Sequence, residues 1–304
     1  MAVVPLGKLV GMEIKLGEAC PFDLGLTLCC GQAFRWNEKG GWWYGVARGR
    51  PVKIRQREGV LESENTDASE IRSYFGLEDD LNAILRLVGR DSFAREVTER
   101  FRGLRILRQE PWECLVSYIC ATYKSIPAIR QMIGRLCQMF GEPARFEGEV
   151  FYGFPCAERL AKASPGELKS CGLGYRAKYV SGTAKRVSAG EFDLGGLRTM
   201  PYEEARSSLL GLPGVGLKVA DCVLLFSAGR LEAFPVDVWV KRAILRHYTP
   251  QFPKEFVDKA VRCRSPSNTE YQALSAFGRQ YFGKYAGYAQ EYLYHHERTH
   301  NSWK

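Results

Sequence analysis

The feature that most constrains this 304-residue chain is a Gly- and Pro-rich turn, Leu212-Pro213-Gly214-Val215-Gly216, between two helical patterns. One pattern ends near Leu210 and the next begins near Leu217. Glycines allow the backbone to approach a ligand closely, and the first amides of a helix have no partner within it. These amides and the positive end of the helix dipole suit a phosphate oxygen. Residues 202–226 therefore predict a helix-hairpin-helix that contacts the DNA backbone without reading sequence.

Two other interpretations of this turn have to be weighed. Gly214-x-Gly216, with Asp237 about twenty positions later, resembles the start of a dinucleotide-binding fingerprint. That fingerprint follows a β-strand, whereas residues 202–210 have helical spacing. A plain corner between two helices, with no ligand, remains open on turn chemistry alone.

Three side chains next to the turn suggest chemistry. Lys218 falls in the first turn of the second helix, where the dipole repels a cation and so favours a neutral, nucleophilic amine. Cys222 lies four residues further on and shares its face. Asp237 ends an extended segment and opens a helix, so helix capping is its simplest role. A cap is also a rigid mount for a catalytic carboxylate.

The rest of the chain predicts two domains. Residues 1–104 contain short alternating runs at 41–46 and 51–56 with glycine turns, typical of a small antiparallel sheet, and then helical patterns. Residues 105–304 have helical spacing almost throughout, with no internal repeat. The expected fold class is an α+β N-terminal domain, a small antiparallel sheet with helices, followed by a mostly α-helical core; the second domain is expected to be all-α.

Composition narrows the class of protein. The 43 Lys and Arg exceed the 34 Asp and Glu, and the resulting charge of +9 permits a polyanionic partner. No apolar run is long enough for a membrane helix, and the first residues do not have the pattern of a signal peptide. Ten cysteines without a C-x-x-C pair indicate reduced thiols rather than zinc or iron–sulfur ligands. We therefore expect an intracellular protein of the cytoplasm or nucleoid, or of the nucleus in a eukaryote.

Five ordered motifs together resemble one enzyme family, the eukaryotic-type 8-oxoguanine DNA glycosylases of the helix-hairpin-helix/Gly-Pro-Asp superfamily. They span nearly the whole chain. The motifs are Phe22-Asp23-Leu24 with Gly31-Gln32-Ala33-Phe34-Arg35-Trp36, Leu107 to Leu115, Gly172 to Ala177, Leu212 to Asp221 with Pro235-Val236-Asp237, and Tyr285 to Gln290.

The resemblance implies a bifunctional glycosylase/lyase. Lys218 would attack the sugar C1′, expel the damaged base and form a Schiff base, after which β-elimination cleaves the strand. Asp237 would stabilise positive charge on the sugar and orient the lysine. No cofactor is implied, because the nucleophile is a side chain. Backbone oxygens of Leu210, Leu212 and Val215 are implied to hold a monovalent cation.

The resemblance also implies a pocket for the extruded base. The backbone carbonyl of Gly31 would accept the N7–H that 8-oxoguanine has and guanine lacks. Cys222 and Tyr294 would sandwich the base, although the family usually has Phe at the latter position. Gln290 would read the Watson–Crick edge. A nucleotide has to leave the duplex to reach such a pocket.

Contacts to DNA are expected from the hairpin and from two other segments. By resemblance, Tyr175 is a wedge beside the vacated stack and Arg176 contacts the orphaned cytosine. The chain departs from the family at residues 121–125, where an Asn-rich run is absent, and at Ala128, where Arg is usual. The residues expected to contact DNA are Gly214, Val215, Gly216, Tyr175, Arg176, Tyr123 and Lys124.

The expected partner is duplex DNA containing 8-oxoguanine, bound by a monomer with no membrane attachment. One alternative is a glycosylase for another damaged purine, which the pocket residues disfavour. Another is a non-catalytic DNA-binding module, which the presence of both Lys218 and Asp237 disfavours. A literal H-E-x-x-H at His296–His300 resembles a zinc-protease helix, but too few residues follow it to supply another ligand.

Overall fold

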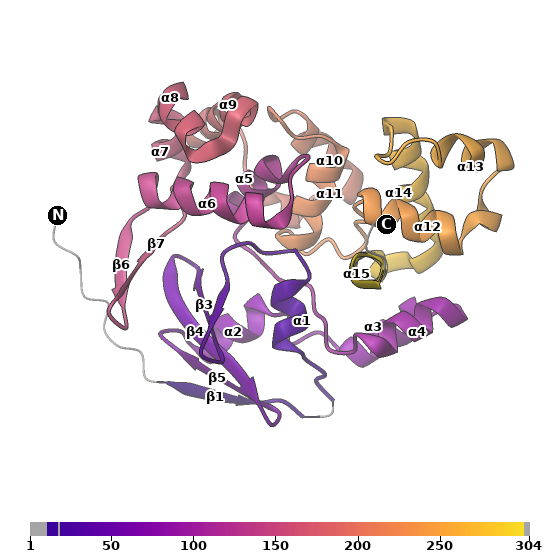
Figure 1. Ribbon diagram of the computed structural model, residues 1–304, viewed down its shortest axis with the longest axis horizontal. Helices are drawn as coiled ribbons and strands as arrows, with labels where there is room; N and C mark the ends of the chain where they lie inside the picture. The colour runs from indigo at the N-terminus through magenta and orange to yellow at the C-terminus, as the bar shows by residue number, and fades with distance from the viewer. Residues whose placement is uncertain (1–10, 18, 301–304) are drawn as a thin grey trace.

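The structure is a computed structural model that describes residues 11–17 and 19–300 (Figure 1). Its N-terminal part is a five-stranded antiparallel sheet with strand order β1-β5-β4-β3-β2. The strands are β1 (Met12–Lys15), β2 (Asn37–Lys39), β3 (Trp42–Ala47), β4 (Arg50–Arg57) and β5 (Val60–Glu64). The strands expected at 41–46 and 51–56 are confirmed as β3 and β4.

Tight turns with left-handed residues connect the central strands. Arg48 and Gly49 between β3 and β4 have φ of 49° and 77°, and Glu58 and Gly59 between β4 and β5 have 47° and 76°. Two consecutive residues with positive φ suit the right-handed twist of a hairpin, and glycine adopts that conformation at little cost. The glycine turns expected from the sequence lie at these positions.

The remaining chain is mainly helical, as expected (Figure 1). The first helices are α1 (Leu24–Cys29), α2 (Ala68–Tyr74), α3 (Leu81–Val88), α4 (Ser92–Arg100), α5 (Pro111–Ala121), α6 (Ile126–Phe140), α7 (Ala157–Lys162) and α8 (Pro165–Leu168). They are followed by α9 (Ala177–Ser188), α10 (Tyr202–Leu210), α11 (Leu217–Phe226), α12 (Val238–His247), α13 (Lys254–Ala260), α14 (Asn268–Phe282) and α15 (Ala286–His300). None of the described helices is long and apolar enough to cross a membrane.

A second, two-stranded hairpin corrects the expectation that residues 105–304 are all-α. Strands β6 (Pro143–Phe146) and β7 (Glu149–Tyr152) pair through a turn at Glu147 and Gly148, both with positive φ. Glu147 binds Lys53 of β4 at 2.7 Å, so the hairpin is fixed against the first sheet. The strands are only four residues long, too short for a clear alternating pattern, and the X-Gly turn was their main signal.

The N-terminal part and the helical part pack against each other and share a hydrophobic core. The apolar faces of α3 and α4 belong to the large core cluster of the helical region, and both helices contact α15. Arg105 is fully buried and donates to the backbone carbonyls of Pro21 (3.0 Å) and Asp79 (3.1 Å). A boundary between residues 104 and 105 remains a prediction.

Candidate active site

The predicted helix-hairpin-helix is present as α10, a tight turn and α11. Gly214 has φ of 79°, and a Cβ placed on it would lie 2.5 Å from Cβ of Tyr179 on α9. Gly216 caps α11 but supplies no side chain, so no side-chain hydrogen bond caps the first amides of α11. The turn therefore combines close backbone packing with uncapped N–H groups, the arrangement that binds an anion.

A buried carboxylate anchors α11 to its neighbours. Asp221 is fully buried and accepts hydrogen bonds from the hydroxyls of Tyr202 (2.6 Å) and Tyr271, and it pairs with Arg206 at 3.0 Å. Burial raises the pKa of Asp221, and the Arg206 guanidinium opposes that rise. Because Tyr202 lies on α10 and Tyr271 on α14, these bonds fix α11, which carries Lys218 one turn earlier.

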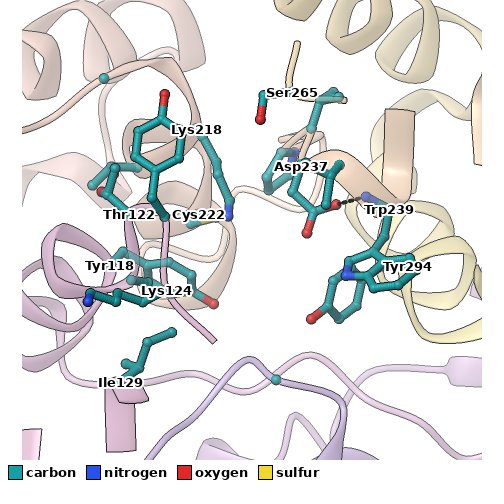
Figure 2. A pocket seen from close by; sticks show the side chains of 18 of the residues that line it. Tyr118, Thr122, Lys124, Ile129, Lys218, Cys222, Asp237, Trp239, Ser265 and Tyr294 are labelled. Carbon is teal, nitrogen blue, oxygen red and sulfur yellow. Dashed lines mark hydrogen bonds between the residues drawn. The ribbon is translucent and has the colours of Figure 1, made fainter. Parts of the chain in front are cut away.

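Lys218 and Asp237 extend into one cavity from opposite sides (Figure 2). Oδ1 of Asp237 accepts both the Trp239 and the Val240 amides at 2.9 Å, which confirms the expected helix cap. These bonds use one carboxylate oxygen, so Oδ2 is left for another partner. None of the ion pairs formed by the described residues includes Lys218. An amine and a rigidly mounted carboxylate thus face the same space.

The cavity has a volume of about 680 Å³, enough for a nucleobase with part of its sugar. It is lined by the loop after α1, by α5 and the start of α6, by the hairpin and α11, by α12, by the start of α14 and by α15. The residues predicted for the site that line it are Gly31, Tyr123, Lys124, Gly214, Gly216, Lys218, Cys222, Asp237, Gln290 and Tyr294. Val215, Tyr175 and Arg176 do not line it.

Gly31 is packed tightly against Tyr294 and Ile126, two other residues of the cavity wall. Its φ is 103°, and a Cβ there would lie 3.1 Å from Oη of Tyr294 and 3.2 Å from Cδ1 of Ile126. The next residue, Gln32, is buried and fixes the loop. Its side-chain nitrogen Nε2 donates to the Arg105 carbonyl at 2.7 Å, and its side-chain oxygen Oε1 accepts the backbone amide of Leu107 at 2.7 Å. This loop therefore holds the Gly31 backbone at a defined position in the cavity wall.

Of the other pocket residues, Cys222 and Gln290 are buried. Cys222 is 3% exposed, and burial raises the pKa of its thiol although the Lys218 charge lowers it. Burial likewise raises the pKa of the Tyr294 phenol. Gln290 is 5% exposed, and its Oε1 accepts no hydrogen bond from the described residues. An unpartnered buried acceptor in a cavity wall is costly unless a ligand supplies the donor.

The predicted DNA-contacting residues outside the hairpin have two different environments. Tyr175 is 53% exposed, as a wedge requires. Arg176 is buried, donates to the Thr122 carbonyl, and has its guanidinium 4.4 Å from the Tyr175 ring centre. In this conformation Arg176 positions the Thr122 loop, so a contact between Arg176 and DNA remains a prediction that needs the loop to open.

The segment that departs from the family forms part of the cavity rim. Tyr123 is 83% exposed and has φ of 54°, a conformation that costs energy for a residue with a side chain. Lys124 follows it, and both residues line the cavity. Lys124 lies on the same side as Lys218 and Tyr118 (Figure 2). The loop thus presents an aromatic ring and a cation at the rim of the cavity that Lys218 enters.

Sequence reasoning missed several residues of the cavity. Glu291 follows Gln290, and Arg298 lies one helical turn after Tyr294 on the same face of α15. Tyr118 of α5 stacks on Phe226, with ring centres 5.6 Å apart, and forms part of the cavity floor. Helical spacing from Gln290 and Tyr294 could have indicated the first two, whereas Tyr118 carries no local signal.

The H-E-x-x-H segment is explained by ion pairs. Glu297 is fully buried and pairs with Arg242 at 2.7 Å and Arg246 at 3.0 Å. Among the described residues, no group of three or more His, Cys, Asp and Glu side chains is arranged to hold a metal ion. This segment therefore fastens α15 to α12.

Comparison with known proteins gives a consistent match over both parts of the chain. Residues 14–115 match the family described as 8-oxoguanine DNA glycosylase, N-terminal domain, and residues 116–260 match the HhH-GPD superfamily base excision DNA repair protein family. A probable N-glycosylase/DNA lyase of Methanothermobacter thermautotrophicus is 32% identical, covering 94% of this chain and 96% of its own length. The N-glycosylase/DNA lyase OGG1 of Arabidopsis thaliana is 33% identical, covering 89% of this chain and 76% of its own.

Solved structures of DNA glycosylases are also similar to this chain. A structure of MBOgg1 in complex with a low-affinity DNA ligand matches with a TM-score of 0.84 and 32% identity, covering 95% of this chain and 99% of that one. The Clostridium acetobutylicum 8-oxoguanine glycosylase/lyase, bound to duplex DNA with cytosine opposite 8-oxoguanine, matches with 0.83 and 31%, covering 92% and 93%. A 3-methyladenine DNA glycosylase from Archaeoglobus fulgidus shares the fold with a TM-score of 0.74 at 23% identity, covering 95% and 99%.

Proposed function

Because this chain belongs to the 8-oxoguanine N-glycosylase/DNA lyase family of the HhH-GPD superfamily, we propose that it removes 8-oxoguanine from duplex DNA through Lys218 and Asp237. The chain is a bifunctional DNA repair enzyme, a glycosylase and a lyase. The observation that carries the residue assignment is that Lys218 and Asp237 line the same cavity as Gly31 and Gln290.

In the proposed reaction the Lys218 amine attacks C1′ of the extruded nucleotide. The C1′–N9 bond breaks, its electron pair leaves with the base, and the lysine–sugar adduct opens to a Schiff base. Loss of a proton from C2′ then expels the 3′ phosphate by β-elimination. Asp237 stabilises the positive charge that develops on the sugar, and its helix-cap bonds keep its free oxygen directed at the reacting atoms.

Discrimination between 8-oxoguanine and guanine is assigned to the Gly31 carbonyl. It accepts N7–H of the lesion, and it faces a lone pair when guanine is present. Because Cys222 and Gln290 around the base are buried, that mismatch leaves both groups unpaired. Cys222 and Tyr294 enclose the two faces of the base, and Oε1 of Gln290 obtains the donor that the free protein lacks.

The hairpin is proposed to bind the phosphates next to the lesion through the backbone of Gly214, Val215 and Gly216. Tyr175 and Tyr123, both exposed aromatic residues, are proposed to stack where the duplex opens, with Lys124 on a phosphate. Arg176 reaches the opposite strand once its bond to Thr122 opens. Every one of these groups comes from a single chain, so a monomer suffices.

A monovalent cation suits the backbone oxygens of the turn. The Leu212 carbonyl accepts the Val215 amide at 3.2 Å, whereas the carbonyls of Leu210 and Val215 accept no backbone hydrogen bond in the part of the chain that is described. Neutral carbonyl oxygens of this kind would hold a monovalent cation without a carboxylate ligand. The bound cation would then neutralise charge on an adjacent phosphate. Since its substrate is genomic DNA, the enzyme acts in the nucleoid or, in a eukaryote, in the nucleus.

Borohydride trapping tests the assignment. The wild-type protein should form a covalent adduct with a duplex containing 8-oxoguanine, and Lys218→Gln should form none while it still binds the duplex. Asp237→Asn should slow excision by at least about 100-fold because it removes a charge that acts in the transition state, yet it retains an oxygen for the cap. An adduct formed by the Lys218→Gln variant would refute the assignment of Lys218 as the nucleophile. Trapping only on an alkylated purine would favour another damaged-base glycosylase, and binding without any excision would favour a non-catalytic module.

A further inference from the structure

Glu291 is a buried acid in the cavity wall that the reaction described above does not use. It lies on α15 directly after Gln290, is 2% exposed and lines the cavity. Its Oε1 has no hydrogen-bond partner among the described residues, and none of their ion pairs includes it. A buried carboxyl oxygen of this kind is expensive to leave unsatisfied, so its position at a ligand cavity points to a ligand atom as the missing partner.

The carboxyl is next to the residue assigned to recognise the lesion. It interacts with the thiol of Cys30, whose chain neighbour is Gly31. Cys30 is itself fixed, because its thiol donates to the Thr27 carbonyl at 3.2 Å and Gln32 donates to its sulfur at 3.1 Å. Glu291 and Gly31, which both line the cavity, are therefore linked through Cys30.

The charged and titratable groups around Glu291 do not compensate its burial. They are Cys30 after α1, Tyr118 on α5, Asp237 at the start of α12, and Tyr294 and Arg298 on α15. Burial raises the pKa of Glu291 to about 7; Arg298 and Cys30 lower it and Asp237 raises it. Near neutral pH a large fraction of this carboxyl therefore keeps its proton and is a hydrogen-bond donor.

The chemistry of the base decides what a donor at this position can do. On the edge that carries N7–H, 8-oxoguanine has a carbonyl oxygen on each side, at C6 and at C8. If the Gly31 carbonyl accepts N7–H, the adjacent protein group faces a carbonyl oxygen. A carboxylate would repel that oxygen, whereas a carboxylic acid donates a hydrogen bond to it.

We propose that Glu291 is a specificity-determining residue whose protonated carboxyl donates a hydrogen bond to a carbonyl oxygen flanking N7–H of the extruded 8-oxoguanine. The inference rests on the proposed function and adds a second contact on the lesion edge beside Gly31. The contact requires the acid form, so base excision becomes weaker when Glu291 ionises.

Single-turnover excision measured between about pH 6 and pH 9 tests this, with wild type, Glu291→Gln and Glu291→Leu. The Gln variant keeps a donor at every pH, so the ratio of wild-type to Gln rate should fall by at least about tenfold as Glu291 ionises. The Leu variant has no donor and should be at least about tenfold slower than Gln throughout. The affinity of each variant for undamaged duplex and its unfolding midpoint are measured as controls, to show that the fold and DNA binding are retained.

Glu113→Gln is the matched control. Burial also raises the pKa of Glu113, which pairs with Arg35 at 2.7 Å but does not line the cavity. The ratio of the wild-type excision rate to the Glu113→Gln excision rate should not change with pH as the ratio for Glu291→Gln does. A constant wild-type to Gln ratio, or a Leu variant as fast as wild type, would overturn the inference and leave the proposed function intact. A wild-type protein that excises no 8-oxoguanine would overturn both.

Discussion

Replacing Gly214 with alanine tests whether the hairpin geometry depends on this glycine. In the folded protein Gly214 has φ of 79°, and an added Cβ would lie 2.5 Å from Cβ and 2.7 Å from Cγ of Tyr179. A left-handed conformation costs a residue with a side chain about 1–2 kcal/mol, and overpacking costs about 1–3 kcal/mol more. We therefore expect Gly214→Ala to lower the free energy of unfolding by about 2–5 kcal/mol.

Gly216 is the matched control for this experiment, two residues further along the same turn. Its backbone is extended (φ −99°, ψ −178°), and no atom lies within 4 Å of an added Cβ. Alanine is a poorer helix cap than glycine, so Gly216→Ala should cost no more than about 1 kcal/mol. Urea unfolding followed by circular dichroism measures both variants. Equal losses for the two variants, or a loss under about 1 kcal/mol for Gly214→Ala, would refute the reasoning.

Three further predictions concern buried polar groups. Asp221→Asn leaves Arg206 without its charge partner and should lower the free energy of unfolding by about 3–5 kcal/mol in urea titrations; a loss under about 1 kcal/mol would contradict this. Because the folded chain holds the Glu291 proton up to about pH 7 instead of the ordinary 4.5, that group's contribution to stability declines as pH rises between these values. Glu291→Gln should therefore gain about 3 kcal/mol relative to wild type from pH 4.5 to pH 8 in the same assay, and a pH-independent difference would contradict it. Gln32→Ala releases the Gly31 loop, so excision should slow by at least about tenfold while affinity for undamaged duplex stays the same; loss of that affinity would indicate general misfolding.

The parts of the fold that the sequence predicts well are those set by local chemistry. The sequence predicts Asp237 as a helix cap, and its side chain accepts two amides of the helix that follows. The hairpin β6–β7 was missed because its pattern is four residues long on each side and stands among helices. Its pairing is stabilised by Glu147 contacts to the first sheet, which no local pattern contains.

The candidate site divides in the same way. Lys218 and Asp237 are recognisable from their motifs, because a turn followed by a helix fixes where each side chain can point. The burial of Arg176 under the Thr122 carbonyl could not be predicted, since it depends on packing between α5 and the segment before α9. Glu291 was overlooked for a related reason: an acid on a helix is ordinarily solvated, and only the docking of α15 against the Gly31 loop removes it from water.

The docking of α15 has a consequence for the timing of synthesis. This helix contributes Gln290, Glu291 and Tyr294 and leaves the ribosome after every other described helix. On the proposed assignment, a nascent chain whose hairpin has folded before α15 docks holds Lys218 and Asp237 but lacks the wall proposed to retain a base beside them. On the same assignment, we expect excision only after translation has delivered α15, the helix proposed to contribute to telling damaged from undamaged nucleotides.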